Sequence, residues 1–294
     1  MRVAIGAVDA DQRRERLVET TAQHHQRPVG ELLREWRERR RLSQLELAIQ
    51  AEVSARHLSF VETSRSRPSR EMVLHLAAQL NVPLRERNHL LLAAGYAPAY
   101  AESALDGPEL ATVRAAVRRV LAGHEPYPAV AVDRHWNLVE ANAGLALFTA
   151  DVAPELLVSP VNCMRLSLHP CGLAPRIVNL GEWRAHLLGK LRRQIALTGD
   201  AALAELHDEL RAYPCDQPEP DIEAPGPGDV AVPLRVRDGG TELAFFGTVA
   251  TFGTPLDITV AELAVEAFFP ADAATMEALH ARHARSAGEE ISSP

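Results

Sequence analysis

The feature that most restricts the fold of this chain is a series of closely spaced helix starts between residues 29 and 95. Ser43, Ser54 and Ser69 each stand directly before a run with apolar residues at helical spacing, and serine is a favoured helix N-cap. Glu46 follows Ser43 by three residues, which completes a capping box. The predicted helices are Val29–Arg41, one starting after Ser43, one starting after Ser54, one from Ser69 to about Leu80, and Leu84–Ala94. Five short helices joined by short turns predict a compact all-α domain.

The chain is long enough for a second domain. It has 294 residues, of which 47% are hydrophobic and 24% charged, the composition of an ordinary globular protein. No apolar run approaches the ~20 residues of a membrane helix, and the N-terminus lacks the apolar core of a signal peptide. Three cysteines, an odd number, argue against a disulfide framework. We therefore expect a cytoplasmic protein that does not enter a membrane.

The net charge of −8 is unevenly distributed along the chain. Residues 29–95 carry eleven arginines against eight carboxylates, whereas residues 96–294 carry fifteen basic against twenty-seven acidic side chains. A mildly basic segment joined to an acidic one is typical of a nucleic-acid-binding domain tied to a domain of another kind. Two unrelated surfaces would give the same distribution, so the charge alone does not decide.

The character of the sequence changes after residue 95. Pro98, Gly107 and Pro108 predict a linker, and a helix is expected at 109–123. The predicted strands are Tyr127–Asp133, Asn137–Ala141, Val230–Val236, Glu242–Phe252 and Ile258–Phe269, and the further helices are Asn142–Thr149, Leu180–Leu197, Ala201–Ala212 and Ala271–Arg285. These elements predict an α+β domain with an antiparallel sheet of about five strands.

The expected organisation is therefore multidomain. The predicted parts are an N-terminal tail at 1–28 with a short helix over Arg13–Gln26, the all-α domain at 29–95, a linker at 96–108, the α+β domain at 109–285, and a C-terminal tail at 286–294.

Residues 43–62 carry the most specific motif of the chain. The run Ser43-Gln44-Leu45-Glu46-Leu47-Ala48, followed by Val53-Ser54 and then by Leu58, Val61 and Glu62, resembles the lambda-repressor-like helix-turn-helix of the Cro or xenobiotic-response-element type. Ala48 is small where two helices would cross, and Val53 would fill the turn between them. The resemblance also implies that Arg37 and Glu62 form a structural ion pair within the domain.

The same resemblance implies which side chains meet double-stranded DNA. Arg56 is expected to read a base, because its planar fork of donors matches guanine O6 and N7. Gln44 matches a position that binds a phosphate, and the residues after the recognition helix suit backbone contacts. The predicted DNA-binding residues are Gln44, Ala55, Arg56, Ser59, Phe60, Thr63, Arg65 and Arg67. The competing interpretations are a solvated charge for Arg56 and a place in the core for Phe60.

The sheet of the second domain opens with two β-prone runs around the turn at Arg134-His135. The run from Tyr127 to Asn142 has the character of a PAS opening hairpin, in which an aspartate, here Asp133, ends the first strand. The similarity extends over residues 107–275 to the MmyB-type ligand-binding domain through Asn162–Pro170, Ala174–Asn179, Glu182-Trp183, Thr251–Asp257 and Phe268–Pro270. That family pairs a helix-turn-helix with a PAS-like sensor and is associated with fatty-acid-like or other apolar ligands.

A sheet whose inner face is covered by helices leaves room for an apolar pocket between the two layers. Arg165 and His169 are the candidates to hold a ligand carboxylate at its mouth, although each also fits a structural hydrogen bond in an irregular loop. The predicted ligand-binding residues are Trp136, Arg165, Leu166, His169, Trp183, Phe246, Val249 and Phe268. Each apolar member of this set also fits a plain hydrophobic core.

The sequence contains none of the catalytic motifs that are recognisable by spacing, such as a P-loop, a nucleophile elbow or the HExxH pattern of metalloproteases. Cys163, His169 and Cys171 lie close together, but their spacing matches no standard zinc module. A redox pair of Cys163 and Cys171 is a second minor alternative. We therefore expect no enzymatic activity, no metal and no cofactor.

The sequence thus predicts a homodimeric transcription regulator whose second domain senses a small amphiphilic or fatty-acid-like ligand. A dimer is expected because one helix-turn-helix covers too few base pairs to be specific. We expect the second domain to supply the dimer contact. The alternative is a DNA-binding regulator whose PAS-like domain docks a protein partner without a small ligand. The absence of catalytic motifs disfavours an enzyme tethered to DNA.

Overall fold

The computed structural model of the chain describes residues 27–220 and 232–291, with side chains up to residue 285. The helix predicted over Arg13–Gln26 lies outside the described residues. The chain divides into two compact units between Glu102 and Ser103, within the segment that the sequence predicts to be a linker. Over the described ranges, no helix combines the length and the apolar character that a membrane span requires.

The first unit is all-α, as the sequence predicts. Its helices are α2 (Val29–Arg39), α3 (Gln44–Gln50), α4 (Ala55–Glu62), α5 (Arg70–Gln79) and α6 (Leu84–Ala93). One core joins them, and Leu33, Leu47, Leu58, Leu76 and Leu91 within it are each at most 1% exposed. Helices this short are marginal by themselves, so burial of ~1.5–3 kcal/mol per large apolar side chain holds the domain together.

Three helix starts are capped by the serines that the sequence predicts. The Ser43 Oγ accepts from the Glu46 N–H at 3.2 Å, and the Glu46 carboxylate accepts from the Ser43 N–H at 2.7 Å. Ser54 and Ser69 each accept from the amide three residues further on, at 3.1 and 3.2 Å. Each cap satisfies an amide that the helix itself leaves unbonded, which contributes ~1 kcal/mol.

The second unit is α+β with one five-stranded antiparallel sheet. Its helices are α7 (Ala111–Gly123), α8 (Ala146–Thr149), α9 (Cys163–Leu168), α10 (Leu180–Thr198), α11 (Ala201–Arg211), α12 (Ile258–Ala261) and α13 (Ala273–Ile291). Its strands are β1 (Ala129–Val132), β2 (Leu138–Ala141), β3 (Leu234–Asp238), β4 (Thr241–Thr251) and β5 (Ala264–Pro270). The order across the sheet is β2-β1-β5-β4-β3, which agrees with the predicted PAS-like architecture.

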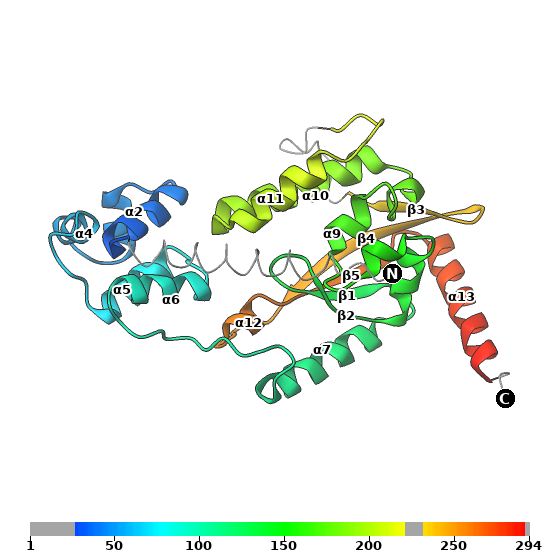
Figure 1. The fold of residues 1–294 in the computed structure, drawn as a ribbon, viewed down its shortest axis with the longest axis horizontal. Coiled ribbons are helices and arrows are strands. Elements are labelled where there is room, and N and C mark those ends of the chain that lie inside the picture. Colours follow the sequence, from blue (N-terminus) through cyan, green and yellow to red (C-terminus); the bar gives the residue numbers. More distant parts are fainter. Residues whose placement is uncertain (1–26, 221–231, 292–294) are drawn as a thin grey trace, which may run out of the picture. The chain divides into compact units, whose positions relative to one another are not determined.

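Helices cover both faces of this sheet. Figure 1 shows α10 and α11 on one side of it and α7 on the other. All four residues of β1 are buried, because Val130 and Val132 join the core under α10 while Ala129 and Ala131 pack beneath α7. We refer to the side covered by α10 as the inner face and to the side covered by α7 as the outer face.

One predicted strand is wrong in its first part. The sequence predicts a single strand over Ile258–Phe269, but the structure has the short helix α12 and only then β5, from Ala264. Asp257 starts the helical turn, because its Oδ1 accepts from the Thr259 and Val260 amides at 2.8 and 3.3 Å. Apolar residues recur through the turn and the strand alike, so the pattern alone does not separate them.

Candidate DNA interface and ligand-binding unit

The helix-turn-helix consists of α3, α4 and the turn between them. Glu52 has a φ of 53°, which reverses the chain, and the Val53 N–H then donates to the Ala48 carbonyl at 2.9 Å. Ala48 is 2% exposed at this crossing. At Gly30 of α2, a Cβ would lie 2.1 Å from the Val61 carbonyl oxygen, so α2 and α4 approach each other more closely than any larger residue permits.

A buried ion pair fixes α4 to α2. The Arg37 guanidinium donates to both Glu62 carboxylate oxygens, at 2.7 and 2.9 Å, and also to the Leu42 carbonyl at 2.7 Å. The two side chains are only 9% and 1% exposed, and the hydrogen bond from Glu62 raises the pKa of Arg37. The structural ion pair that the sequence predicts is therefore confirmed.

The Gln44 side chain belongs to the same cluster. Its Nε2 donates to the Glu62 Oε2 at 2.7 Å, so this amide is already engaged in the free protein. A phosphate at Gln44 would have to replace that bond or use the exposed backbone at the start of α3.

The outward surface of α4 offers a cation held over an aromatic ring. The Arg56 guanidinium lies 5.4 Å from the centre of the Phe60 ring, one helical turn away, and Arg56 is exposed. Ala55, Ser59 and Phe60 are partly exposed on the same helix, so Phe60 is not a core residue. A guanidinium over a ring loses fewer conformations when it binds a base edge.

The two arginines after α4 differ. Arg65 and the neighbouring Thr63 are exposed, and the Thr63 hydroxyl donates to the Ser59 carbonyl at 2.7 Å. The Arg67 guanidinium instead donates twice to the Ala94 carbonyl, at 3.2 and 2.8 Å, and lies over the Tyr96 ring. Arg67 thus fastens the segment after α4 to the end of α6.

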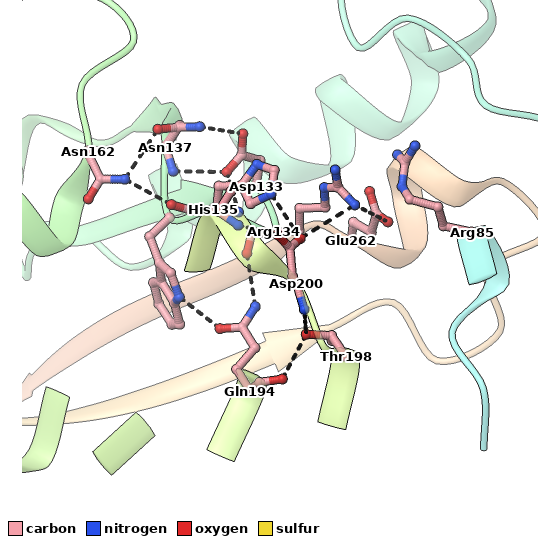
Figure 2. A network of polar contacts seen from close by, with 12 residues as sticks. Arg85, Asp133, Arg134, His135, Asn137, Asn162, Gln194, Thr198, Asp200 and Glu262 are labelled. Atoms are coloured by element: carbon pink, nitrogen blue, oxygen red, sulfur yellow. Dashed lines mark hydrogen bonds and ion pairs between the residues drawn. The ribbon is translucent and has the colours of Figure 1, made fainter. Parts of the chain in front are cut away.

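In the second unit, the β1–β2 hairpin is held by a network of polar contacts (Figure 2). Asp133 accepts from the His135 and Asn137 amides at 2.8 and 2.9 Å and from the Asn137 side chain at 2.9 Å. Asn162, before α9, donates to the His135 carbonyl at 2.8 Å. The aspartate that the sequence singled out therefore shapes the turn of the hairpin.

The hairpin is also fixed to the junction of α10 and α11. The His135 ring meets the Asp200 carboxylate at 3.0 Å, and Gln194 donates to the Arg134 carbonyl at 2.9 Å. Burial alone would raise the pKa of Asp200, but the hydrogen bond and charge of His135, with Arg134 near by, lower that pKa to about 2. The carboxylate is therefore ionised across the physiological range.

Trp136 lies at the tip of this hairpin with a φ of 67°, and its side chain is buried in the inner core. Its Nε1 donates to the Gln194 Oε1 at 2.9 Å, and the Lys190 ammonium lies 4.2 Å from the centre of the ring. Positive φ is unusual for a bulky residue, and the hydrogen bond at the edge of the ring and the ammonium over its face hold this conformation.

The other apolar residues predicted to line the pocket differ in whether they belong to the inner core. Trp183 and Phe268 are 4% and 8% exposed within the inner core, and the Trp183 Nε1 donates to the Ser167 hydroxyl at 2.9 Å. Leu166 is buried but lies outside that core cluster. The structure therefore brings Trp136, Trp183 and Phe268 into one apolar layer between α10 and the sheet.

Sequence reasoning missed an ion pair within this layer. Lys190, the only lysine of the chain, lies on α10, and its Nζ meets the Glu266 Oε1 of β5 at 2.8 Å. The two side chains are 21% and 13% exposed. Nearby, His186 stacks on Trp183, and burial, together with the charges of Lys190 and Arg193, lowers the pKa of His186 to about 4. A lone lysine among thirty arginines was the only signal in the sequence.

Arg165 and His169, the residues predicted to hold a ligand carboxylate, contact α11 and the residues that follow it. The Arg165 guanidinium donates to both Glu209 oxygens at 2.7 Å, and the Tyr213 hydroxyl donates to the same carboxylate at 2.6 Å. The His169 ring packs edge-on against Tyr213 and accepts from the Cys171 amide at 3.0 Å. Both residues thus join α9 to α11 and are bound to protein partners.

The interior placement predicted for Phe246 and Val249 is wrong. The two side chains are 40% and 48% exposed. Phe246 lies on the outer face, where it stacks on Phe269 with 5.4 Å between ring centres. Val249 lies on the inner face beside Glu266, but on a part of β4 that the helices leave open. Alternation along a strand predicts which residues share a face, not how far a helix extends over it.

The cysteines do not form a reactive pair. Burial raises the pKa of the Cys163 thiol to about 12, which keeps it protonated and unreactive. Cys171 is exposed beside a shallow pocket of ≈ 250 Å³, lined also by Asp151, Ala153, Pro170, Gly172, Pro175 and Arg176. Over the part of the chain that the structure describes, no three histidine, cysteine or acidic side chains gather as a metal site.

A braced helix-turn-helix joined to a PAS-like α+β unit defines the class of DNA-binding regulators with a sensory domain. Residues 113–281 match the family described as MmyB-like transcription regulator ligand binding domain, and residues 28–90 match the family described as helix-turn-helix domain. Because the first match spans more than half of the chain, the protein belongs to the MmyB-like family of transcription regulators.

No curated protein matches the chain. Among solved structures, the chain is similar to one titled "Structure of an RNA-binding Light-Oxygen-Voltage Receptor", with 13% sequence identity and a TM-score of 0.27 over 98% of this chain and 70% of that one. A likeness of this size adds nothing to the family assignment.

Proposed function

We propose that this transcription regulator reads DNA as a homodimer through α4 and that its second unit binds a small amphiphilic molecule. The observation that carries the proposal is the exposed Arg56–Phe60 pair on a helix held in place by the buried Arg37–Glu62 ion pair. An exposed cation on a rigid helix is what direct readout of the major groove requires.

The proposed division of labour on DNA follows from what each side chain already binds. Arg56 reads a base, with Ala55, Ser59 and Phe60 beside it on the groove side of the helix. Thr63 and Arg65 contact the phosphate backbone. Gln44 and Arg67 act mainly inside the protein, because their polar groups are bonded to Glu62 and to the Ala94 carbonyl.

The test compares two arginines on the operator that the full-length protein selects from random DNA. Arg56→Ala should weaken binding to that operator by about 1–3 kcal/mol and leave binding to random DNA nearly unchanged. Arg65→Ala is the matched control, and it should weaken both to a similar extent and reduce the salt dependence by about one phosphate contact. An equal loss on both DNAs for Arg56→Ala would make it a backbone contact.

For the ligand, we propose an apolar chain or ring lying against Trp136, Trp183, Leu166 and Phe268, with an acidic end at Lys190. Arg165 and His169, bonded within the protein, are secondary candidates for that end. Among the described residues, Lys190 pairs with one carboxylate, Glu266, and Arg193 is a second cation close enough to lower the pKa of His186. That excess of basic groups favours an added carboxylate, and the aromatic layer favours an apolar tail.

Thermal unfolding of the full chain with lauric, palmitic and naphthoic acids tests this proposal. Binding at a hundredfold excess over Kd should stabilise the protein by about 2.7 kcal/mol. The paired change Lys190→Gln with Glu266→Gln removes the cation without leaving a charge unpaired, and it should abolish the rise. The matched control, Arg165→Gln with Glu209→Gln, should retain it. No rise with any acid would contradict ligand sensing.

The second candidate function is docking of a protein by the second unit without a small ligand. The exposed apolar side chains of β4, Phe246 and Val249, favour it. It predicts no stabilisation by any acid and loss of a complex when these two residues become polar.

A further inference from the structure

One strand of the sheet continues beyond its neighbour. β4 spans Thr241–Thr251, but β3 pairs only with Thr241–Phe245. Among the described residues, 27–220 and 232–291, the remaining segment Phe246–Thr251 pairs only with β5. All six of its residues are exposed, and Figure 1 shows β4 running on toward α12. We call this segment the β4 edge.

The ladder between β3 and β4 begins at Leu234, next to residues that are bound by Asn179. Leu234, opposite Phe245, is the first paired residue of β3. Pro233 before it has no N–H, and its carbonyl accepts from the Asn179 side chain at 2.8 Å. The Arg235 amide donates to the same Asn179 side chain at 3.1 Å. Asn179 therefore binds the backbone on both sides of Leu234, at the edge of the strand that faces away from β4.

The β4 edge presents unpaired backbone groups. The Ala271 amide donates to the Ala244 carbonyl at 2.8 Å, so Ala244 and every second residue after it point their backbone groups toward β5. Gly247, Val249 and Thr251 consequently point their N–H and C=O groups away from β5. No partner for these groups exists among residues 27–220 and 232–291.

Nothing in the segment protects this edge from pairing. Its sequence, Phe-Gly-Thr-Val-Ala-Thr, has no charged residue and no proline, and Thr248, Val249 and Thr251 are β-branched. Natural proteins usually guard exposed edge strands with lysine, proline or bulges. An unguarded edge six residues long is a ready template for another strand.

We propose that the β4 edge pairs antiparallel with the β4 edge of a second copy of this chain, which makes it the dimer contact of the regulator. The proposal rests on the homodimer proposed above, because two helix-turn-helix units read two half-sites. An antiparallel pair of identical strands is two-fold symmetric by construction, which is the symmetry of a closed dimer. A different protein would need its own uncharged strand of matching length.

The register of such a pair follows from the backbone directions. With the two-fold axis at Val249, that residue faces its copy in a hydrogen-bonded pair, and Gly247 faces Thr251 of the other copy. These three pairs give about six backbone hydrogen bonds. On the outer face, Thr248 of one copy lies opposite Ala250 of the other. The side chains that face each other are therefore uncharged and small enough for the two strands to come within hydrogen-bonding distance.

The proposed contact is one strand away from the proposed ligand site. Val249 is the direct neighbour of Glu266 on β5, and Glu266 holds Lys190. A ligand carboxylate that takes Lys190 from Glu266 would leave a free carboxylate beside the dimer axis. Two such carboxylates, one from each copy, would repel each other and alter the dimer that DNA binding needs.

Analytical ultracentrifugation of the full chain, from sub-micromolar to tens of micromolar, tests the contact. Val249→Lys and Val249→Glu each set two like charges at the axis and should weaken dimerisation about 100-fold. A mixture of the two variants should recover dimers as mixed pairs, because opposite charges then meet. Val120→Lys is the matched control, since Val120 is 55% exposed on α7, and it should dimerise like the wild type. Circular dichroism verifies the fold of each.

The other possible results would refute the β4 edge, the homodimer or the two-fold pairing separately. Val249→Lys and Val249→Glu chains that dimerise like the wild type would refute the β4 edge and leave the homodimer standing. Loss of the dimer in Val120→Lys alone would place the contact on the α7 side. A wild-type chain that stays monomeric, free and on its operator, would refute the homodimer and this contact together. Loss of dimers in both variants without recovery on mixing would also refute the two-fold pairing.

Discussion

The two units treat their cations in opposite ways. On the first unit, Arg56 and Arg65 are exposed while the structural Arg37 is buried against Glu62. In the second unit, the only lysine lies within the protein and is paired with Glu266. A surface that meets polyanionic DNA keeps its cations hydrated until binding, whereas a cation inside needs a counter-charge at all times. At the two proposed sites, the surface that would meet DNA thus carries exposed charge, and the interior that would hold a ligand carries paired charge.

Breaking the Arg37–Glu62 pair should have the largest effect. Glu62→Ala leaves the Arg37 guanidinium buried without its carboxylate, so we expect a loss of about 3–5 kcal/mol in the free energy of unfolding of the first unit. Urea unfolding measures it. Arg34→Ala, which removes the exposed Arg34–Glu38 pair and leaves both carboxylate partners of Arg37 in place, is the control and should change the free energy of unfolding far less. Similar losses in the two variants would show that the buried pair is not what braces α4.

An intermediate effect is expected at the ion pair of the second unit. Glu266→Gln leaves the Lys190 ammonium without a counter-charge and should cost about 2 kcal/mol, because the pair is only partly buried. The paired change Lys190→Gln with Glu266→Gln should cost less than the single one. A fatty acid should stabilise Glu266→Gln more than the wild type, since its carboxylate supplies the missing charge. Equal stabilisation of the two proteins would argue against Lys190 as the anchor.

The smallest effect concerns pH. Burial, with help from Lys190 and Arg193, lowers the pKa of His186 to about 4 in the folded protein, compared with ~6.5 when unfolded. The folded state therefore binds this proton less readily, so its contribution to stability is complete above pH ~6.5 and is lost as the pH falls toward 4. We expect a loss of about 1 kcal/mol, reduced by solvent screening. His186→Gln should flatten the unfolding profile between pH 6.5 and 4; an unchanged slope would exclude His186 as its source.

The interior of the second unit is where sequence reasoning was least complete. Trp136, Trp183 and Phe268 gather in one apolar layer as expected, but the charged side chains near them are Lys190 and Glu266, seventy-six positions apart in the chain. Arg165, which a sequence pattern makes the natural anchor, pairs with Glu209 forty-four positions away. Pairings across such separations depend on how α9, α10 and α11 pack, which no local pattern records.

The sequence by itself determined the features that depend on neighbours in the chain. Serine caps, helical spacing and the small Ala48 at the helix crossing act over a few residues, so the helix-turn-helix and the β1–β2 hairpin follow from local chemistry. The tertiary structure alone decided which charges pair, that α12 replaces the first part of the predicted last strand, and that β4 extends beyond its pairing with β3. Whether a strand face is covered or an edge is open depends on where distant elements end, and no local pattern within β4 records that its pairing with β3 stops at Phe245.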